Sequence, residues 1–96
     1  MNMKKVIVVQ VRVKEKKVKS FLKLAKNMVD ESLSENGCLI YKLSRDLKKD
    51  NEFVFYEKYE NEKAVENHYL SEHFKNFIDS AMPLLINEPL IENFEV

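Results

Sequence analysis

The chain has 96 residues, with 16 basic and 16 acidic side chains and a formal net charge of zero at pH 7. Its length fits one domain over residues 1–96, and its balanced charge gives no reason to expect a nucleic-acid or anionic-membrane partner. The single cysteine, the single glycine and the lack of a run of roughly 18 apolar residues argue against an intrachain disulfide, a glycine-rich phosphate loop and a membrane-spanning helix. We therefore expect a soluble, cytoplasmic domain.

The first part of the chain predicts a strand followed by a helix. Residues 4–13 begin as a continuous apolar run and end in alternation, which suits a strand covered on both faces. Residues 14–33 then carry apolar side chains three and four positions apart, as in an amphipathic helix. Its first turn has no good capping residue, and we expect Asn36 and Gly37 to supply the left-handed backbone that ends it.

The rest of the chain predicts two strands, two short helices and a last strand. Residues 38–45 and 52–60 are the strands, and a polar hairpin connection joins them. Asn61 and Ser71 are expected to cap the two helices, and residues 90–96 alternate enough for a final strand. The predicted inward positions of the two helices are Val65, His68, Tyr69, Phe74, Phe77, Ile78 and Ala81.

This order of elements, β-α-β-β-α-β, predicts a ferredoxin-like α+β fold with a four-stranded antiparallel sheet and helices on one face. Alternation in the third strand points Phe53, Phe55 and Tyr59 toward one face and Val54 and Tyr56 toward the other. The second face is therefore also apolar. We expect another copy of the same sheet to cover it, forming a homodimer through sheet faces.

Three motifs in sequence order carry a resemblance to a known family. They are ENGCLIY at residues 35–41, FVFYEKY at residues 53–59 and HYLSEHF at residues 68–74. Together they resemble the antibiotic biosynthesis monooxygenase family, which includes quinol monooxygenase-like members, and the similarity runs from Val6 to Val96. The resemblance implies a dimeric α+β barrel with a pocket between the helices and the sheet of each subunit. It also implies oxygenation of an aromatic or quinol-like substrate without a metal or flavin cofactor.

Glu57 and His68 are the predicted catalytic residues. Glu57 interrupts an apolar strand face, where burial raises the pKa of a carboxyl group and suits it to abstract a proton from a phenol or an α-carbon. His68 lies on the apolar stripe of a helix and could act as a base or orient a substrate hydroxyl. The alternatives are a glutamate that accepts structural hydrogen bonds and a histidine that only packs.

Aromatic side chains are the predicted contacts of the substrate, because they stack on a flat ring and their hydroxyls can bind a quinone oxygen. The alternative for each is packing in the core or at a dimer interface. The predicted substrate-binding residues are Tyr41, Phe55, Tyr59, Tyr69 and Phe74.

We predict no metal site, because His68 and His73 are five residues apart and would not share a helix face. His73 is expected at the surface or in the capping region of its helix, and Cys38 is expected to pack as a small apolar residue. Met28 and Met82 are expected in the core. Two departures from the family pattern matter for its chemistry. Tyr59 stands where many members carry tryptophan, and Phe77 and Ile78 stand where haem-degrading relatives carry a histidine ligand, so haem degradation is not expected.

Three functions are compatible with the sequence. The first is a cofactor-independent monooxygenase that oxidises a small aromatic or quinol-type substrate with molecular oxygen. The second is an isomerase or tautomerase that acts on a small carbonyl substrate with the same residues. The third is a non-catalytic dimeric module that binds a small hydrophobic molecule, for example in a stress response.

Overall fold

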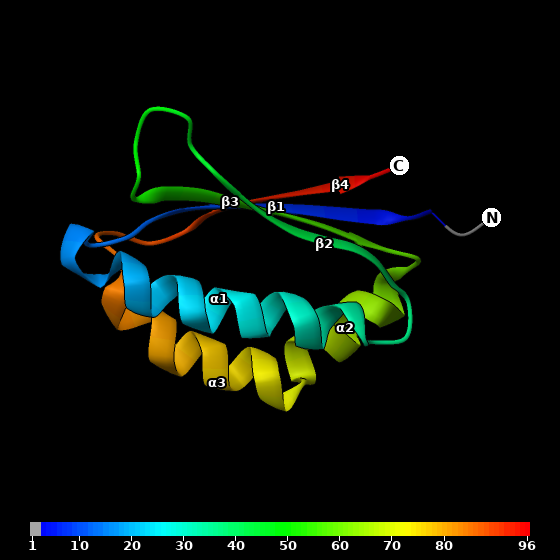
Figure 1. The fold of residues 1–96 in the computed structure, drawn as a ribbon. Helices are drawn as coiled ribbons and strands as arrows, with labels where there is room; N and C mark the ends of the chain where they lie inside the picture. The colour runs from blue at the N-terminus through cyan, green and yellow to red at the C-terminus, as the bar shows by residue number, and fades with distance from the viewer. Residues whose placement is uncertain (1–2) are drawn as a thin grey trace.

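The computed structural model describes residues 3–96, which form four strands and three α-helices (Figure 1). Two short 3₁₀ turns, at Glu15–Lys17 and Met82–Leu84, flank the first and last helices. Within residues 3–96, none of the helices is both long and apolar enough to cross a membrane. In chain order the elements are β1 (Lys5–Arg12), α1 (Val18–Leu33), β2 (Cys38–Arg45), β3 (Glu52–Tyr59), α2 (Glu62–Leu70), α3 (Glu72–Ala81) and β4 (Leu90–Glu95).

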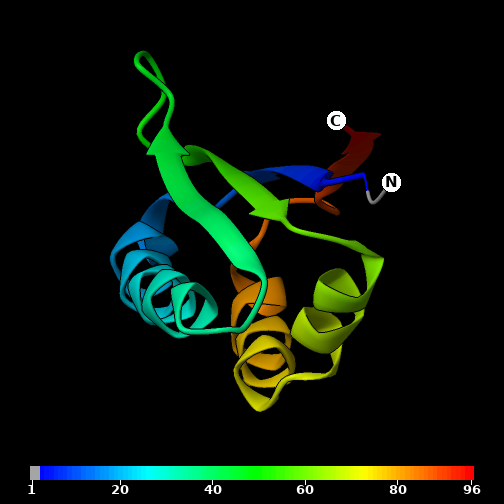
Figure 2. The ribbon, with the colours of Figure 1, turned by 90° about the vertical axis from the view of Figure 1, so that its right-hand side faces the viewer.

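The strands form one antiparallel sheet in the order β2-β3-β1-β4. All three helices lie below the same face of this sheet, and no element within residues 3–96 covers the opposite face (Figures 1 and 2). The predicted ferredoxin-like α+β fold is therefore confirmed. The register of the sheet places Glu57 of β3 opposite Ile7 of β1 and opposite Tyr41 of β2.

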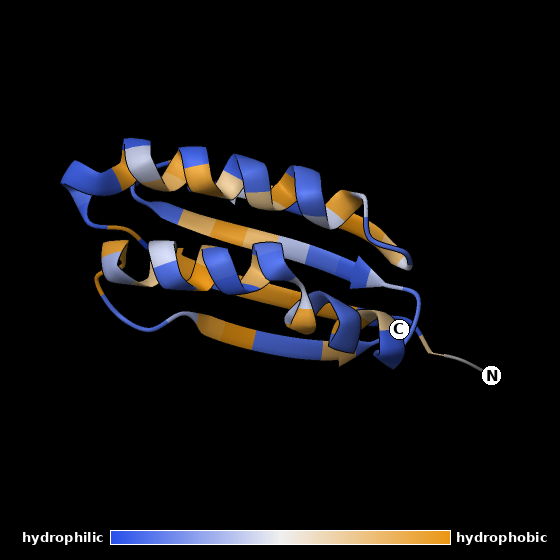
Figure 3. Cartoon of the chain, turned by 90° about the horizontal axis from the view of Figure 1, so that it is seen from below, coloured by the Kyte–Doolittle hydropathy of each residue, from blue (hydrophilic) through white to orange (hydrophobic). Residues whose placement is uncertain are grey.

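The side chains of β3 alternate as predicted. Phe53, Phe55 and Tyr59 are buried on the face that the helices cover, whereas Val54 and Tyr56 lie on the uncovered face and are exposed. The Phe21 ring of α1 packs against Phe53 with ring centroids 5.1 Å apart. Blue and orange positions alternate along α1 and α3 in Figure 3, as in helices that bury one side only.

The structure corrects two expectations for helix packing. Met28 is buried as predicted, but Met82 is 38% exposed because α3 ends at Ala81 and the chain turns away there. Tyr69, predicted to face inward, is also partly exposed, since it follows His68 on α2 and lies toward the edge of the helix layer.

Both predicted helix caps are present. The Asn61 side chain accepts a hydrogen bond from the Ala64 amide at 3.0 Å, and the Ser71 hydroxyl accepts one from the Phe74 amide at 3.2 Å. Ser71 also separates α2 from α3, because its backbone is extended, with φ −70° and ψ 152°. The α3 axis consequently takes a new direction immediately after α2 (Figure 2).

Gly37 has the predicted left-handed backbone, but it lies beyond the end of helix α1 rather than at it. Helix α1 ends at Leu33, and Gly37 lies in the following turn, in which the Cys38 amide donates to the Glu35 carbonyl. Gly37 has a φ of +84°, and a Cβ atom added there would lie 2.7 Å from the Ala64 Cβ. The glycine therefore allows both the tight turn into β2 and the close approach of α2.

The substitution Gly37→Ala should destabilise the protein by about 1–3 kcal/mol, because it combines a strained left-handed backbone with a clash against α2. Urea unfolding followed by circular dichroism measures this change. The adjacent exposed substitution Asn36→Ala is the control, and its effect should stay within about 0.5 kcal/mol. Equal stabilities of the two variants would show that the turn tolerates a side chain at Gly37.

Candidate functional site

Glu57 is a buried carboxyl group in the middle of the sheet. Its side chain lies on the face that the helices cover, and the residue is only 4% exposed. The Tyr59 hydroxyl donates a hydrogen bond to Glu57 Oε1 at 2.7 Å. These two residues are i and i+2 on β3, so strand alternation alone puts both side chains on the same face. The site thus consists of an acid held by a neighbouring phenol.

Burial raises the pKa of Glu57 from 4.5 to about 7, because the low-dielectric interior disfavours the charged carboxylate. Hydrogen bonds from Tyr59 and, to a smaller extent, Tyr41 act in the opposite direction, and the negative charge of Glu35 adds to the increase. Near neutral pH both protonation states of Glu57 are therefore populated. A carboxyl group in this state can accept a proton from a weak acid and return it.

Glu57 borders a cavity of about 90 Å³ between the sheet and helix α3. The wall is mainly aromatic and aliphatic, and Glu57 is the only carboxylate among its lining residues. Met82 of the 3₁₀ turn and Ile91 of β4 also border the cavity, and both are exposed, so they mark its rim. Four of the five predicted substrate-binding residues line it, namely Tyr41, Phe55, Tyr69 and Phe74.

The fifth predicted contact, Tyr59, and the predicted catalytic His68 are not among the residues that line this cavity. His68 is 1% exposed, and its ring packs against Tyr41 and Tyr59 with centroid separations of 5.5 and 5.6 Å. Burial lowers the pKa of His68, and its contact with Glu35 opposes this shift. His68 therefore packs against Tyr41 and Tyr59 away from the cavity, whereas Glu57 borders the cavity itself.

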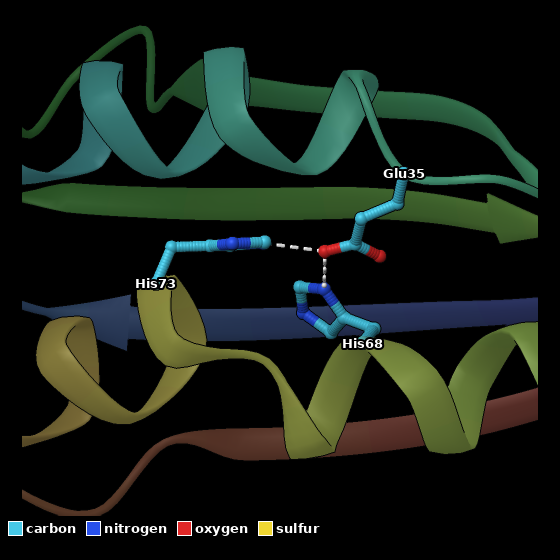
Figure 4. Close-up of side chains that lie close together, drawn as sticks. All are labelled: Glu35, His68 and His73. Atoms are coloured by element: carbon cyan, nitrogen blue, oxygen red, sulfur yellow. Dashed lines mark hydrogen bonds and ion pairs between the residues drawn. The ribbon is translucent and has the colours of Figure 1, made fainter.

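His68 instead belongs to a cluster with Glu35 and His73 (Figure 4). Glu35 Oε2 accepts hydrogen bonds from His68 Nδ1, at 2.8 Å, and from His73 Nε2. His73 lies beside the cap residue Ser71, as one of the two expectations had it, but it is not at the surface, since its side chain is only 17% exposed. The reason is the break at Ser71: on one continuous helix two histidines five positions apart diverge, but here each begins from a differently directed helix.

Glu35 was not predicted as a site residue, although it is the first residue of the 35–41 motif. Its side chain is largely buried, and Oε1 has no hydrogen-bond partner within residues 3–96. The feature of the sequence that could have drawn attention to Glu35 is its position two residues before Gly37, at the start of a tight turn. The sequence could not show that this turn directs the carboxylate inward, because the histidines it meets are 33 and 38 residues away.

Cys38 packs as predicted. It is partly buried against both groups of core residues, and burial raises the pKa of its thiol to about 11. The thiol therefore stays protonated at neutral pH and is a poor nucleophile.

The fold and the cavity define a small α+β protein with an apolar cavity between its sheet and its helices and one acidic residue, Glu57, in the cavity wall. The family model of the antibiotic biosynthesis monooxygenases matches residues 6–80, which is most of the chain. The protein belongs to the antibiotic biosynthesis monooxygenase family, as the sequence motifs indicated.

The chain is similar to proteins from several organisms. "Putative monooxygenase YcnE" of Bacillus subtilis (strain 168) is 33% identical over 78% of this chain and 79% of its own length. "Uncharacterized protein sll1783" of Synechocystis is 29% identical over 95% of this chain, and the match spans 62% of that longer relative. A solved structure, the "Putative antibiotic biosynthesis monooxygenase from Nitrosomonas europaea", shares the fold with a TM-score of 0.94. It is 19% identical and covers 100% of this chain and 92% of its own.

The stability of the protein should depend on pH through Glu57. Because its folded pKa of about 7 lies above the value of 4.5 in an unfolded chain, the folded state holds this proton more tightly. The free energy of unfolding should therefore fall as pH rises through this range, by roughly 3 kcal/mol in total. Glu57→Gln removes this loss, so the variant should gain stability relative to wild type between about pH 4 and about pH 8.

Urea unfolding at the two pH values tests this expectation. The matched control is Glu60→Gln, which makes the same charge change at an exposed position of the same segment. Its stability relative to wild type should be nearly the same at both pH values. If Glu57→Gln behaves as this control does, then Glu57 does not hold its proton as described.

Proposed function

We propose that the protein is a monooxygenase that oxidises a small, flat phenolic or quinol-type substrate with molecular oxygen in the cavity at Glu57. The observation that carries the proposal is the single carboxylate, with a pKa raised to about 7, in an otherwise apolar wall. Membership of the antibiotic biosynthesis monooxygenase family and the similarity to YcnE support oxygenation as the reaction type.

Glu57 would act as the general base. It takes a proton from a substrate hydroxyl, and the resulting phenolate passes one electron to O₂. The substrate radical and the superoxide then combine: a new carbon–oxygen bond forms between them, and the product is a peroxide. Cleavage of the O–O bond leaves one oxygen atom on the ring as a hydroxyl group and releases the other as water. A hydroquinone and O₂ thus give a hydroxyquinone and H₂O. The substrate supplies all the electrons, so this reaction needs neither a cofactor nor an external reductant.

The cavity favours a small aromatic ligand. Its volume of about 90 Å³ is below the roughly 150 Å³ of a cavity that holds benzene. A ring can therefore enter only if rim side chains move aside. Tyr69 and Met82 border the cavity and are partly exposed, so they have room to do so. Closure behind the substrate would exclude water from the radical pair.

Tyr59 and His68 would act as positioning residues in this mechanism. Tyr59 fixes the carboxyl group of Glu57 through its hydrogen bond, and the His68 ring packs against Tyr59. Neither borders the cavity, so neither is expected to touch the substrate. Tyr41, Phe55 and Phe74 would hold the substrate ring.

The contacts of Glu57 bear on the alternative functions. A purely binding module is expected to lock such a carboxylate with backbone amides, whereas the groups that hydrogen-bond to Glu57 within residues 3–96 are the hydroxyls of Tyr59 and, to a smaller extent, Tyr41. A titratable base is equally suited to an isomerase, which moves a proton next to a carbonyl group. The requirement for oxygen distinguishes these two reactions.

The test is oxygen consumption by the purified protein with a panel of hydroquinones and dihydroxynaphthalenes. Glu57→Gln should lower the rate by about 10²- to 10⁴-fold, because it removes the general base. The exposed control Glu60→Gln should retain the wild-type rate. Equal rates of Glu57→Gln and wild type would contradict the role of Glu57, and turnover of a small carbonyl substrate without oxygen would favour the isomerase.

The uncovered face of the sheet supports a homodimer as the working form. Tyr56 lies at its centre and is 38% exposed, and Val54, Leu90 and Phe94 are also exposed apolar residues on these strands. A second copy of the same face would bury this surface, and we propose that two subunits associate through it.

Tyr56→Lys should therefore dissociate the dimer, because it places a charge in the middle of the apolar face. Sedimentation equilibrium at micromolar concentration measures the mass of wild type and variant. Leu70→Lys, at an exposed position on α2, is the control and should remain dimeric. A wild-type protein that sediments as a monomer would rule out this assembly.

A further inference from the structure

We propose that Glu35, His68 and His73 form a binding site for one divalent transition-metal ion, with Zn²⁺ the best fit. The site is separate from the Glu57 cavity and goes beyond the proposed oxygenase reaction. None of its three residues borders that cavity.

The three donor atoms already converge. One carboxylate oxygen of Glu35, Nδ1 of His68 and Nε2 of His73 all lie within 4.8 Å of one another, and their side chains point toward a common centre (Figure 4). Zinc lies about 2.0–2.2 Å from nitrogen and oxygen ligands, so tetrahedral ligands are roughly 3.3 Å apart. Glu35 Oε2 and His68 Nδ1 are 2.8 Å apart. The carboxylate oxygen lies within hydrogen-bond distance of both histidine nitrogens, so it would have to move outward by about half an ångström or more to admit the ion.

The charge and hydrogen bonding of Glu35 provide an independent reason for a cation. Its Oε1 atom is buried and has no hydrogen-bond partner within residues 3–96. The ion pairs found for Glu35 in this part of the chain involve the two histidines, and no lysine or arginine contacts it. A buried carboxylate is costly without a strong positive partner, and a divalent ion would supply one while contacting either oxygen.

The donor set selects the ion. Two imidazole nitrogens and one carboxylate oxygen suit Zn²⁺, which usually completes four-coordination with a water or another ligand. The Ser71 hydroxyl, which is 3.3 Å from His73 Nε2 and donates to the His68 carbonyl, lies beside this cluster. Hard oxygen-seeking ions such as Mg²⁺ are a poorer match for two nitrogens.

The ion would have a structural effect, because its ligands come from three separate segments. Glu35 lies in the turn between α1 and β2, His68 near the end of α2 and His73 in the first turn of α3. Coordination would fasten the turn after α1 to both α2 and α3 at the break at Ser71. Binding to the folded state alone would raise the stability of the fold.

The experiment uses the full chain freed of metal by dialysis against a chelator. Calorimetric titration with Zn²⁺ should give one ion per chain, and the ion should raise the melting temperature. Titration with Co²⁺ should give the visible absorption of a cobalt ion bound to nitrogen and oxygen ligands. His73→Gln and Glu35→Gln should each weaken Zn²⁺ binding at least about tenfold.

Glu72→Gln is the matched control, because it removes a carboxylate that is exposed and adjacent to His73. It should bind Zn²⁺ as tightly as wild type. Circular dichroism shows whether each variant is folded, and His73→Gln changes the more accessible of the two histidines. Absence of stoichiometric binding by wild type would overturn the proposal, and so would unchanged affinity in the folded His73→Gln variant.

Discussion

A carboxyl group confined to the apolar interior of the sheet is the constraint on which the rest of the molecule depends. Strand pairing places Glu57 between Ile7 and Tyr41, and its side chain is only 4% exposed and borders the cavity between the sheet and the helices. A charge in that position has to be hydrogen-bonded or neutralised by a proton. Tyr59 donates the hydrogen bond to Glu57. The raised pKa means that Glu57 also holds a proton in part of the molecules near neutral pH. The raised pKa at this position thus follows from burial.

The Glu57 site and the cluster of Glu35, His68 and His73 both contact the aromatic rings of the core. Tyr59 hydrogen-bonds to the Glu57 carboxyl group, and the ring of His68, from the Glu35 cluster, packs against both Tyr41 and Tyr59. The negative charge of Glu35 nevertheless contributes to the pKa of Glu57. An ion bound at Glu35, His68 and His73 would therefore change the pKa of Glu57 through its charge, even though no residue belongs to both centres.

The fold was largely predictable from the sequence, and the site was predictable only in part. Strand alternation was enough to assign Glu57 to the covered face, and the capping residues Asn61 and Ser71 were recognisable from local chemistry. The position of His68 was not, because periodicity shows that a residue is buried but not which neighbours surround it. The meeting of Glu35 with His73 depends on contacts between segments far apart in the chain, which no local pattern contains. The break at Ser71 was predicted, yet its effect on the direction of His73 is a three-dimensional property.

The extended backbone at Ser71 also limits how this region can change in length. Residues on a helix rotate by about 100° per position, so one residue inserted or deleted between His68 and His73 would turn one of them away from Glu35. The hairpin between β2 and β3 has no such restriction, because its residues border neither the Glu57 cavity nor the Glu35 cluster. Variation in length among related chains should therefore concentrate in that hairpin, while the spacing across Ser71 stays fixed.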